Sequence, residues 1–137
     1  MSDWVMLVPS FVFSRIKADF SQKLKNQYGM TGEHFSTVNR KTADAKFPTI
    51  LVQNLPSVEQ GADLEGSTIN AGLFSFQVDV FDNRSQGRTR EVMTEVVRIM
   101  KEMRFQVVAM PEFEASSDGT YRCTARFRRL IGSGDVL

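Results

Sequence analysis

The stretch from Leu73 to Phe81 constrains the fold more than any other part of the sequence. Its apolar and polar residues alternate, with one set made of Phe74, Phe76, Val78 and Val80 and the other of Ser75, Gln77 and Asp79. Successive side chains of a β-strand point to opposite faces, so each set lies on one side of a strand. The alternation predicts a strand with one face in the core and the other in polar surroundings.

Two segments instead show the three-and-four spacing typical of one helical face. The first contains Phe13, Ile16, Phe20, Leu24 and Tyr28. Pro9 and Ser10 suit a helix start and Gly29 suits a stop, so we expect a helix from about Ser10 to Tyr28.

The second helical stripe consists of Val92, Val96, Ile99 and Met103. It predicts a helix from about Arg88 to Met103, preceded by a turn at residues 82–87. Charged residues, Glu95 and Arg98 among them, are expected on the side of this helix that faces water.

Further strands are expected where β-branched and aromatic residues gather between turn residues. They are a short strand at His34–Val38, a strand at Phe47–Leu55 that Pro56 ends, and two strands at Phe105–Glu114 and Thr120–Ile131. The last two form a hairpin around Asp118-Gly119. Between the strand at Phe47–Leu55 and the strand at Leu73–Phe81, the segment Ser57 to Gly72 has no usable period and is expected to be a long loop.

These elements predict one α+β domain over residues 1–137, with a mainly antiparallel sheet of about four to five strands and two helices on one face. Residues 1–9 are expected to be an N-terminal extension and residues 132–137 a flexible tail. A chain of this length buries roughly 68% of the surface that it exposes when unfolded, so one hydrophobic core is possible.

Composition argues against catalysis and metal binding. Cys123 is the only cysteine and His34 the only histidine, so the chain has too few such residues for thiolate zinc sites, and a catalytic His would need partners that the sequence does not suggest. Glu112 and Glu114 share a strand face, but nothing around them would separate their pKa values as an acid–base pair requires. We expect no enzyme activity, no cofactor and no metal.

Charge and hydropathy bear on partners and location. The formal net charge is +1, so no global field draws the protein to nucleic acid or to an anionic membrane. The apolar stretches are far shorter than the roughly 20 residues of a membrane-spanning helix, and Asp3 replaces the basic start of a signal peptide. Synthesis in the cytoplasm, without membrane association, is the expectation.

The last strand carries the most suggestive cluster, because Arg122, Arg126 and Arg128 fall on one face. Three interpretations remain open. The arginines could line a groove for phosphate or carboxylate, pair with Glu112 and Glu114 on an exposed sheet face, or belong to a subunit interface.

Self-assembly is favoured by two further features. An open sheet has edges that a second chain can complete, and the polar residues Gln60, Asp63, Glu65 and Asn70 lie in or beside the unpatterned segment. Together with the three arginines, these are the candidate interface residues.

Several segments resemble the tail terminator proteins of long-tailed bacteriophages, which are also called tail completion or head–tail joining proteins. The resemblance covers about residues 12–131. It rests on Phe13-Ser14-Arg15-Ile16-Lys17, on Phe47-Pro48 opening a strand, on Phe76-Gln77-Val78-Asp79-Val80-Phe81-Asp82-Asn83 before a helix, and on Asp118 to Phe127 with its run Asp-Gly-Thr-Tyr-Arg-Cys-Thr-Ala-Arg-Phe.

The resemblance implies a virion structural protein at the head–tail junction, made in the cytoplasm of the bacterial host. It implies a homo-oligomeric ring, typically a hexamer, that caps the head-proximal end of the tail tube and stops its growth. Tail tube protein and head–tail connector protein would be its partners, and DNA would pass through the lumen without sequence-specific binding. A neighbouring head–tail connector ring and a small nucleic-acid-binding module using the three arginines are the alternatives.

Overall fold

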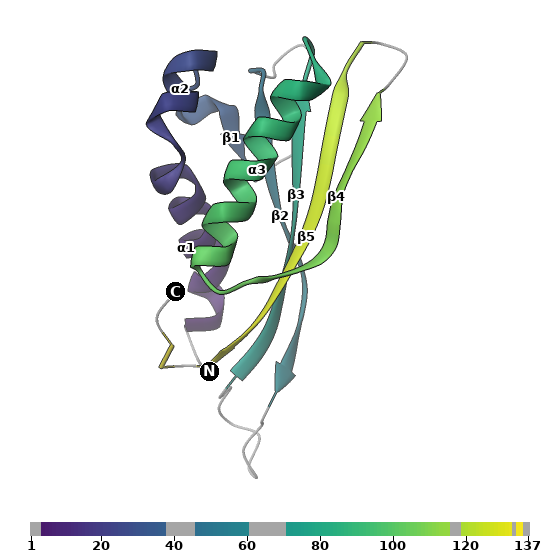
Figure 1. Cartoon of the computed structure of the whole chain (residues 1–137). Helices are drawn as coiled ribbons and strands as arrows, with labels where there is room; N and C mark the ends of the chain where they lie inside the picture. The colour runs from purple at the N-terminus through teal and green to yellow at the C-terminus, as the bar shows by residue number, and fades with distance from the viewer. Residues whose placement is uncertain (1–3, 38–45, 61–70, 116–118, 133, 136–137) are drawn as a thin grey trace.

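The computed structural model shows helices gathered on one side of a twisted sheet, with the other side of the sheet uncovered (Figure 1). It describes residues 4–37, 46–60, 71–115, 119–132 and 134–135. The helices are α1 (Trp4–Asp19), α2 (Gln22–Tyr28) and α3 (Gln86–Glu102), with a short 3₁₀ turn η1 at Gly32–His34. The strands are β1 (Phe35–Ser36), β2 (Thr49–Gln60), β3 (Ala71–Asp82), β4 (Gln106–Ala115) and β5 (Tyr121–Gly132). The α+β class expected from the sequence is confirmed.

The five described strands form one mixed sheet in the order β1-β2-β3-β5-β4. The pairings β2·β3, β3·β5 and β4·β5 are antiparallel, and β1 runs parallel to β2 through the pairs Phe35↔Ile50 and Ser36↔Leu51. β5 is therefore inserted between its hairpin partner β4 and the earlier strand β3. This order places the last strand inside the sheet, next to the edge strand β4.

The core lies between the sheet and the helices. On β3, Phe74, Phe76, Val78 and Val80 are all buried, which confirms the predicted alternation. From α3 the core receives Val92, Met93, Val96, Ile99 and Met100, and from β5 it receives Cys123, Ala125 and Phe127. The predicted α3 stripe is confirmed, and Ser85 caps the helix by accepting a hydrogen bond from the Arg88 N–H.

The first predicted helix was wrong at its start. The expected start at Ser10, with residues 1–9 as an extension, is contradicted because α1 begins at Trp4. Trp4 lies against Phe74 with ring centroids 5.9 Å apart, and Val8 is buried. This contact with the core stabilises the first turns, so Pro9 lies inside the helix and not at its beginning.

The same helix is also interrupted, so that three α-helices take the place of the two expected. α1 ends at Asp19 and α2 starts at Gln22. Phe20, at the break, places its ring 5.6 Å from that of Phe35 in an edge-to-face arrangement. Gly29, with φ of 63°, caps α2 in the left-handed conformation, as the sequence predicts.

The second strand is longer than predicted. Pro56 does not end β2, because the strand continues to Gln60 past a register shift between Leu55 and Val58. A proline is tolerated there since no described strand pairs with the outer side of this part of β2, so its missing N–H costs no ladder bond with the described residues. The expected loop from Ser57 to Gly72 is correspondingly shorter, and residues 61–70 between the strands lie outside the described part.

The short strand expected at His34–Val38 is reduced to the two residues of β1, because His34 belongs to η1. The hairpin of β4 and β5 is confirmed by the pair Ala115↔Tyr121. In the expected flexible tail, the Gly132 N–H donates to Asp135 Oδ2 at 2.7 Å, and the Asp135 N–H donates to the Gly132 carbonyl at 3.0 Å.

Candidate functional site

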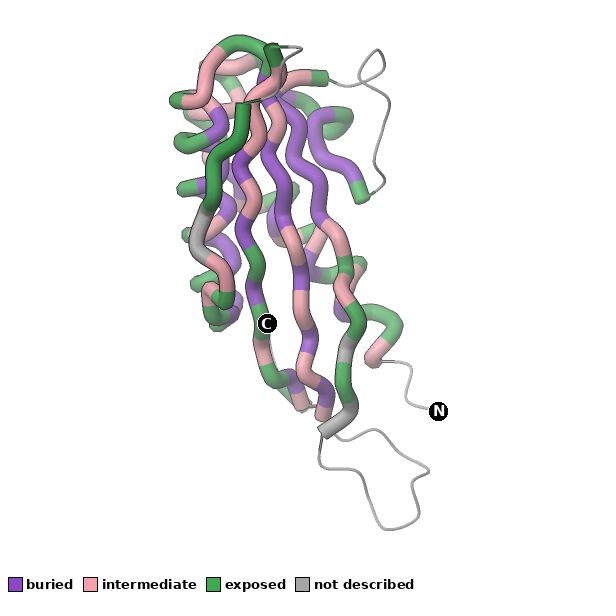
Figure 2. Tube along the Cα trace, turned by 90° about the vertical axis from the view of Figure 1, so that its right-hand side faces the viewer, coloured by how far each residue is buried: buried purple, intermediate pink, exposed green. Residues whose placement is uncertain are grey.

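The uncovered face of the sheet holds the three arginines that the sequence singled out. In Figure 2 the sheet lies in front of the helices and shows this face to the viewer. Residues of even number on β5 point to it, since Cys123, Ala125 and Phe127 point to the core. We call this surface the open face.

Arg122 is anchored within the open face. Its Nη2 lies 3.1 Å from Asp79 Oδ1, and its Nη1 lies 3.8 Å from Glu114 Oε2. Asp79 also accepts hydrogen bonds from Thr124 Oγ1 at 2.5 Å and from Gln77 Nε2 at 3.2 Å. Because Asp79 is only 1% exposed, its carboxylate oxygens depend on these donors for hydrogen bonds that water does not supply. Arg122 is therefore engaged in ion pairs within its own subunit.

Arg126 and Arg128 are more available to a partner, and both are exposed. The Arg126 Nε donates to Gln77 Oε1 at 2.9 Å, which is a neutral acceptor and leaves the charge uncompensated. The guanidinium of Arg128 makes no hydrogen bond or ion pair with the described residues; its ladder neighbours are Ser75 and Gln106. The open face therefore offers two unneutralised guanidinium groups.

Beside these arginines lies an apolar row that sequence reasoning missed. Val58, Leu73 and Leu130 are paired in register across β2, β3 and β5. Val58 and Leu130 are each 55% exposed. The sequence already indicated this row, because Leu130 is an even-numbered residue of the strand, like Arg126 and Arg128. It therefore lies on the same face and is the apolar member of an otherwise polar set.

Both edges of the sheet have unpaired backbone among the described residues. β4 is the last strand in the order and pairs with no described strand other than β5, while β1 covers no more of β2 than Ile50 and Leu51. Val108 on β4 is 51% exposed. Such edges can accept a strand from a second chain.

The remaining predicted interface residues are not brought together with the arginines in the described part. Gln60 ends β2, where it pairs with Ala71, and its side chain is not described. Asp63, Glu65 and Asn70 lie outside the described residues. Glu112 and Glu114 are exposed on the open face, and Glu114 forms one of the pairs with Arg122 that the sequence suggested.

Cysteine and histidine side chains often take part in catalysis or metal binding, and the single cysteine and single histidine of this chain are both buried. Cys123 is fully covered, and burial raises the pKa of its thiol to about 11. Burial also lowers the pKa of His34, whose Nδ1 lies 2.9 Å from the Thr31 N–H. Among the described residues, no three His, Cys, Asp or Glu side chains lie close enough to hold a metal ion together.

Comparison with protein-family models and with curated protein sequences finds no match to this chain. In the described part of the chain, every helix is too short or too polar to cross a bilayer. The assignment of a function therefore depends on the open face, the strand edges and the resemblance noted above.

Proposed function

We propose that this protein is a structural component of a long-tailed phage virion, located at the head–tail junction. In this function, copies of the chain form a ring, typically a hexamer, on the head-proximal end of the tail tube, end its elongation and offer a docking surface to the head connector. DNA would cross the lumen without sequence-specific contacts.

The observation that carries the proposal is the open face. Exposed aliphatic side chains of Val58 and Leu130 adjoin the unneutralised guanidinium groups of Arg126 and Arg128. Interface cores are enriched in arginine and depleted in other charged residues, whereas a sheet face meant only for water would not need the apolar row. The open face therefore suits contact with another protein.

The strand edges that no described residue pairs with support a ring in particular. They belong to different strands, β4 on one side of the sheet and the distal half of β2 on the other. Contact between two unlike edges is heterologous, and a heterologous contact produces a closed ring when its rotation closes.

Negative-stain microscopy of the purified protein, alone and mixed with phage tail tubes, tests the proposal. We expect closed rings, or caps at one end of the tubes. Monomers that ignore the tubes would overturn it. Binding to a connector ring in place of the tube would support instead the neighbouring connector function.

A pair of leucine variants tests the part played by the open face. Leu130→Asp places a charge in the apolar row, and Leu7→Asp places one on α1, where Leu7 is 64% exposed. Both sites are exposed, so each variant should stay within about 0.5 kcal/mol of the wild-type stability. We expect Leu130→Asp to lose assembly and Leu7→Asp to keep it; equal assembly of both variants would show that the open face is not the interface.

A second candidate function is nucleic-acid binding, which the Arg128 guanidinium favours because it pairs with none of the described residues. Arg122 contributes less to it than the sequence suggested, because Asp79 already compensates its charge. Phosphate contacts release counterions, so binding to DNA must weaken as salt rises. A DNA titration at two salt concentrations, with Arg128→Gln as the variant, separates this function from ring assembly.

A further inference from the structure

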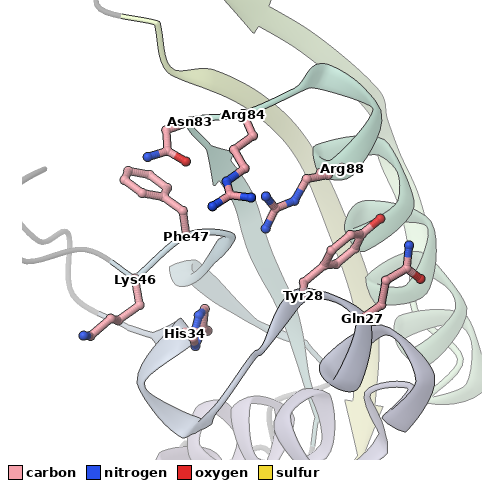
Figure 3. A pocket seen from close by; sticks show the side chains of 8 residues that line it. All are labelled: Gln27, Tyr28, His34, Lys46, Phe47, Asn83, Arg84 and Arg88. Atoms are coloured by element: carbon pink, nitrogen blue, oxygen red, sulfur yellow. The ribbon is translucent and has the colours of Figure 1, made fainter.

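A basic pocket lies away from the open face, where the end of α2, the residues before β2 and the turn between β3 and α3 meet. Its volume is about 610 Å³, and its walls include Tyr28, His34, Lys46, Asn83, Arg84 and Arg88. Figure 3 shows the guanidinium groups of Arg84 and Arg88 directed into the same space. Cavities of several hundred cubic ångströms are typical of small-molecule sites.

The positive charges of this pocket are largely uncompensated. Among the described residues, neither the Arg84 guanidinium nor the Lys46 ammonium has a carboxylate at ion-pair distance. Arg88 has one, because its Nε lies 3.5 Å from Asp82 Oδ2. The described lining residues thus include three cations and no carboxylate; Asp82, beside Arg88, and Glu91, bonded to the Tyr28 hydroxyl, are carboxylates that lie outside the lining.

Arg88 is held in a fixed orientation. Its guanidinium carbon lies 4.6 Å from the centroid of the Tyr28 ring, and its side chain is only 16% exposed. The Asp82 carboxylate that approaches its Nε is itself fixed by the N–H groups of Arg84 and Ser85, at 3.2 and 3.0 Å. A guanidinium held in this way loses little further freedom when it binds, so its terminal N–H groups are preorganised.

The other lining residues discussed here, His34 and Tyr28, are polar but add no positive charge. The Nδ1 of His34 accepts a hydrogen bond from the Thr31 N–H, and the buried ring lines the pocket. The Tyr28 hydroxyl is hydrogen-bonded to Glu91, which lies on α3 outside the lining of the pocket. Neither group adds a cation, so the positive charge belongs to Lys46, Arg84 and Arg88.

We propose that this pocket binds a phosphate group, with Arg84 and Arg88 as planar donors and Lys46 as a point charge. Three cations in the lining, with no carboxylate among the described lining residues, suit the charge of about −1.5 to −2 on a phosphate monoester at pH 7. The pocket is independent of the open face, so this inference does not rest on ring assembly. The ligand is either inorganic phosphate or a small phosphate monoester.

Titration followed by amide NMR tests the proposal, with inorganic phosphate and adenosine monophosphate as probes and adenosine as the uncharged control, all at constant ionic strength. We expect saturable shifts at residues around the pocket. Tighter binding of adenosine monophosphate than of phosphate would identify a monoester as the ligand class, and equal binding would identify the free ion. Shifts that never saturate, or that adenosine reproduces, would overturn the proposal.

Variants at three positions test whether phosphate binds at this pocket. Arg84→Gln and Lys46→Gln change exposed side chains, so both should fold, and each should weaken phosphate binding by about tenfold to a hundredfold. Arg128→Gln removes the same charge on the open face and should leave the affinity unchanged. Equal weakening by all three variants would show diffuse attraction to a cationic surface and would overturn the proposal.

Discussion

Arg122 on β5 closes an ion pair with Asp79 on β3, its Nη2 lying 3.1 Å from Asp79 Oδ1. The two residues are not direct ladder partners, since Asp79 pairs with Thr124 and Arg122 pairs with Phe81. The contact is therefore diagonal across two strands. It joins a half-exposed guanidinium to a carboxylate that has almost no contact with water.

Replacing Arg122 should destabilise the fold more than replacing its neighbours on the open face. In Arg122→Ala, the buried Asp79 keeps Thr124 and Gln77 as its only side-chain donors among the described residues, which should cost about 1–3 kcal/mol. Arg126→Ala and Arg128→Ala should stay within about 0.5 kcal/mol of the wild type. Urea unfolding of the three variants measures these differences.

A double-mutant cycle provides the control for this prediction. Asp79→Asn removes the buried charge, so Arg122→Ala should cost less in that background than in the wild type. Equal costs in both backgrounds would show that the ion pair does not stabilise the protein.

The ion pair between Arg98 and Glu95 lies beside the break between α1 and α2. It should make the free energy of unfolding depend on pH in the acid range. Arg98 donates to Glu95 through Nε at 2.6 Å and to the Asp19 carbonyl through Nη2 at 3.1 Å. The hydrogen bond from Arg98 lowers the pKa of Glu95 below its ordinary value of 4.5, against the opposing effect of burial. The folded protein thus holds the charged form of Glu95 more strongly than the unfolded chain does.

The sign of the pH dependence follows from that lowered pKa. The stabilisation is complete above pH 4.5 and is lost as the pH falls through the folded-state pKa, because the unfolded chain then binds more protons. Glu95→Gln should flatten the stability profile in this acid range. Glu102→Gln, which alters an exposed partner of Arg98, is the matched control and should leave most of the slope. The same slope in Glu95→Gln as in the wild type would contradict the prediction.

The sequence predicted which side of a strand each residue occupies better than it predicted which strands lie next to each other. The parity of Arg122, Arg126 and Arg128 follows from alternation within one strand, and the structure keeps it. One of the three interpretations paired the arginines with Glu112 and Glu114, because the hairpin was visible in the sequence. Asp79 is closer because β5 inserts beside β3, and that strand order depends on how separate segments pack.

Sequence reasoning failed where tertiary contacts override local signals. Pro9 suits a helix start, yet contact of Trp4 and Val8 with the core extends α1 before it. Glu95 was expected in water, but its position beside the α1–α2 break buries it. The basic pocket was missed for a similar reason. Its cations come from segments far apart in the chain, and no spacing rule joins Lys46 to Arg84.

Tyr28 should remain protonated at a pH that ionises an ordinary tyrosine. Burial and the hydrogen bond to Glu91 raise its pKa from 10.0 to about 12. The raised pKa means that the protonated hydroxyl stabilises the fold below pH 10 and loses this effect as the pH rises towards 12. In an ultraviolet absorbance titration, Tyr28→Phe should leave the signal change near pH 10 unaltered and remove a later one. A loss of signal near pH 10 would refute the raised pKa.

Cys123 should be inert in the folded protein and become reactive only on unfolding. Its side chain is fully buried on the core face of β5, in register with Val80 and Phe113, and burial raises the pKa of its thiol to about 11. The thiolate is the nucleophile, so both the raised pKa and the lack of access suppress reaction with a disulfide reagent at neutral pH.

The rate at which a disulfide reagent labels Cys123 across a urea series should follow the unfolded fraction measured by circular dichroism. Because the sequence contains one cysteine, labelling reports on this strand alone. Rapid labelling without urea would mean that β5 is exposed at Cys123, which would also place the adjacent Arg122–Asp79 pair in doubt.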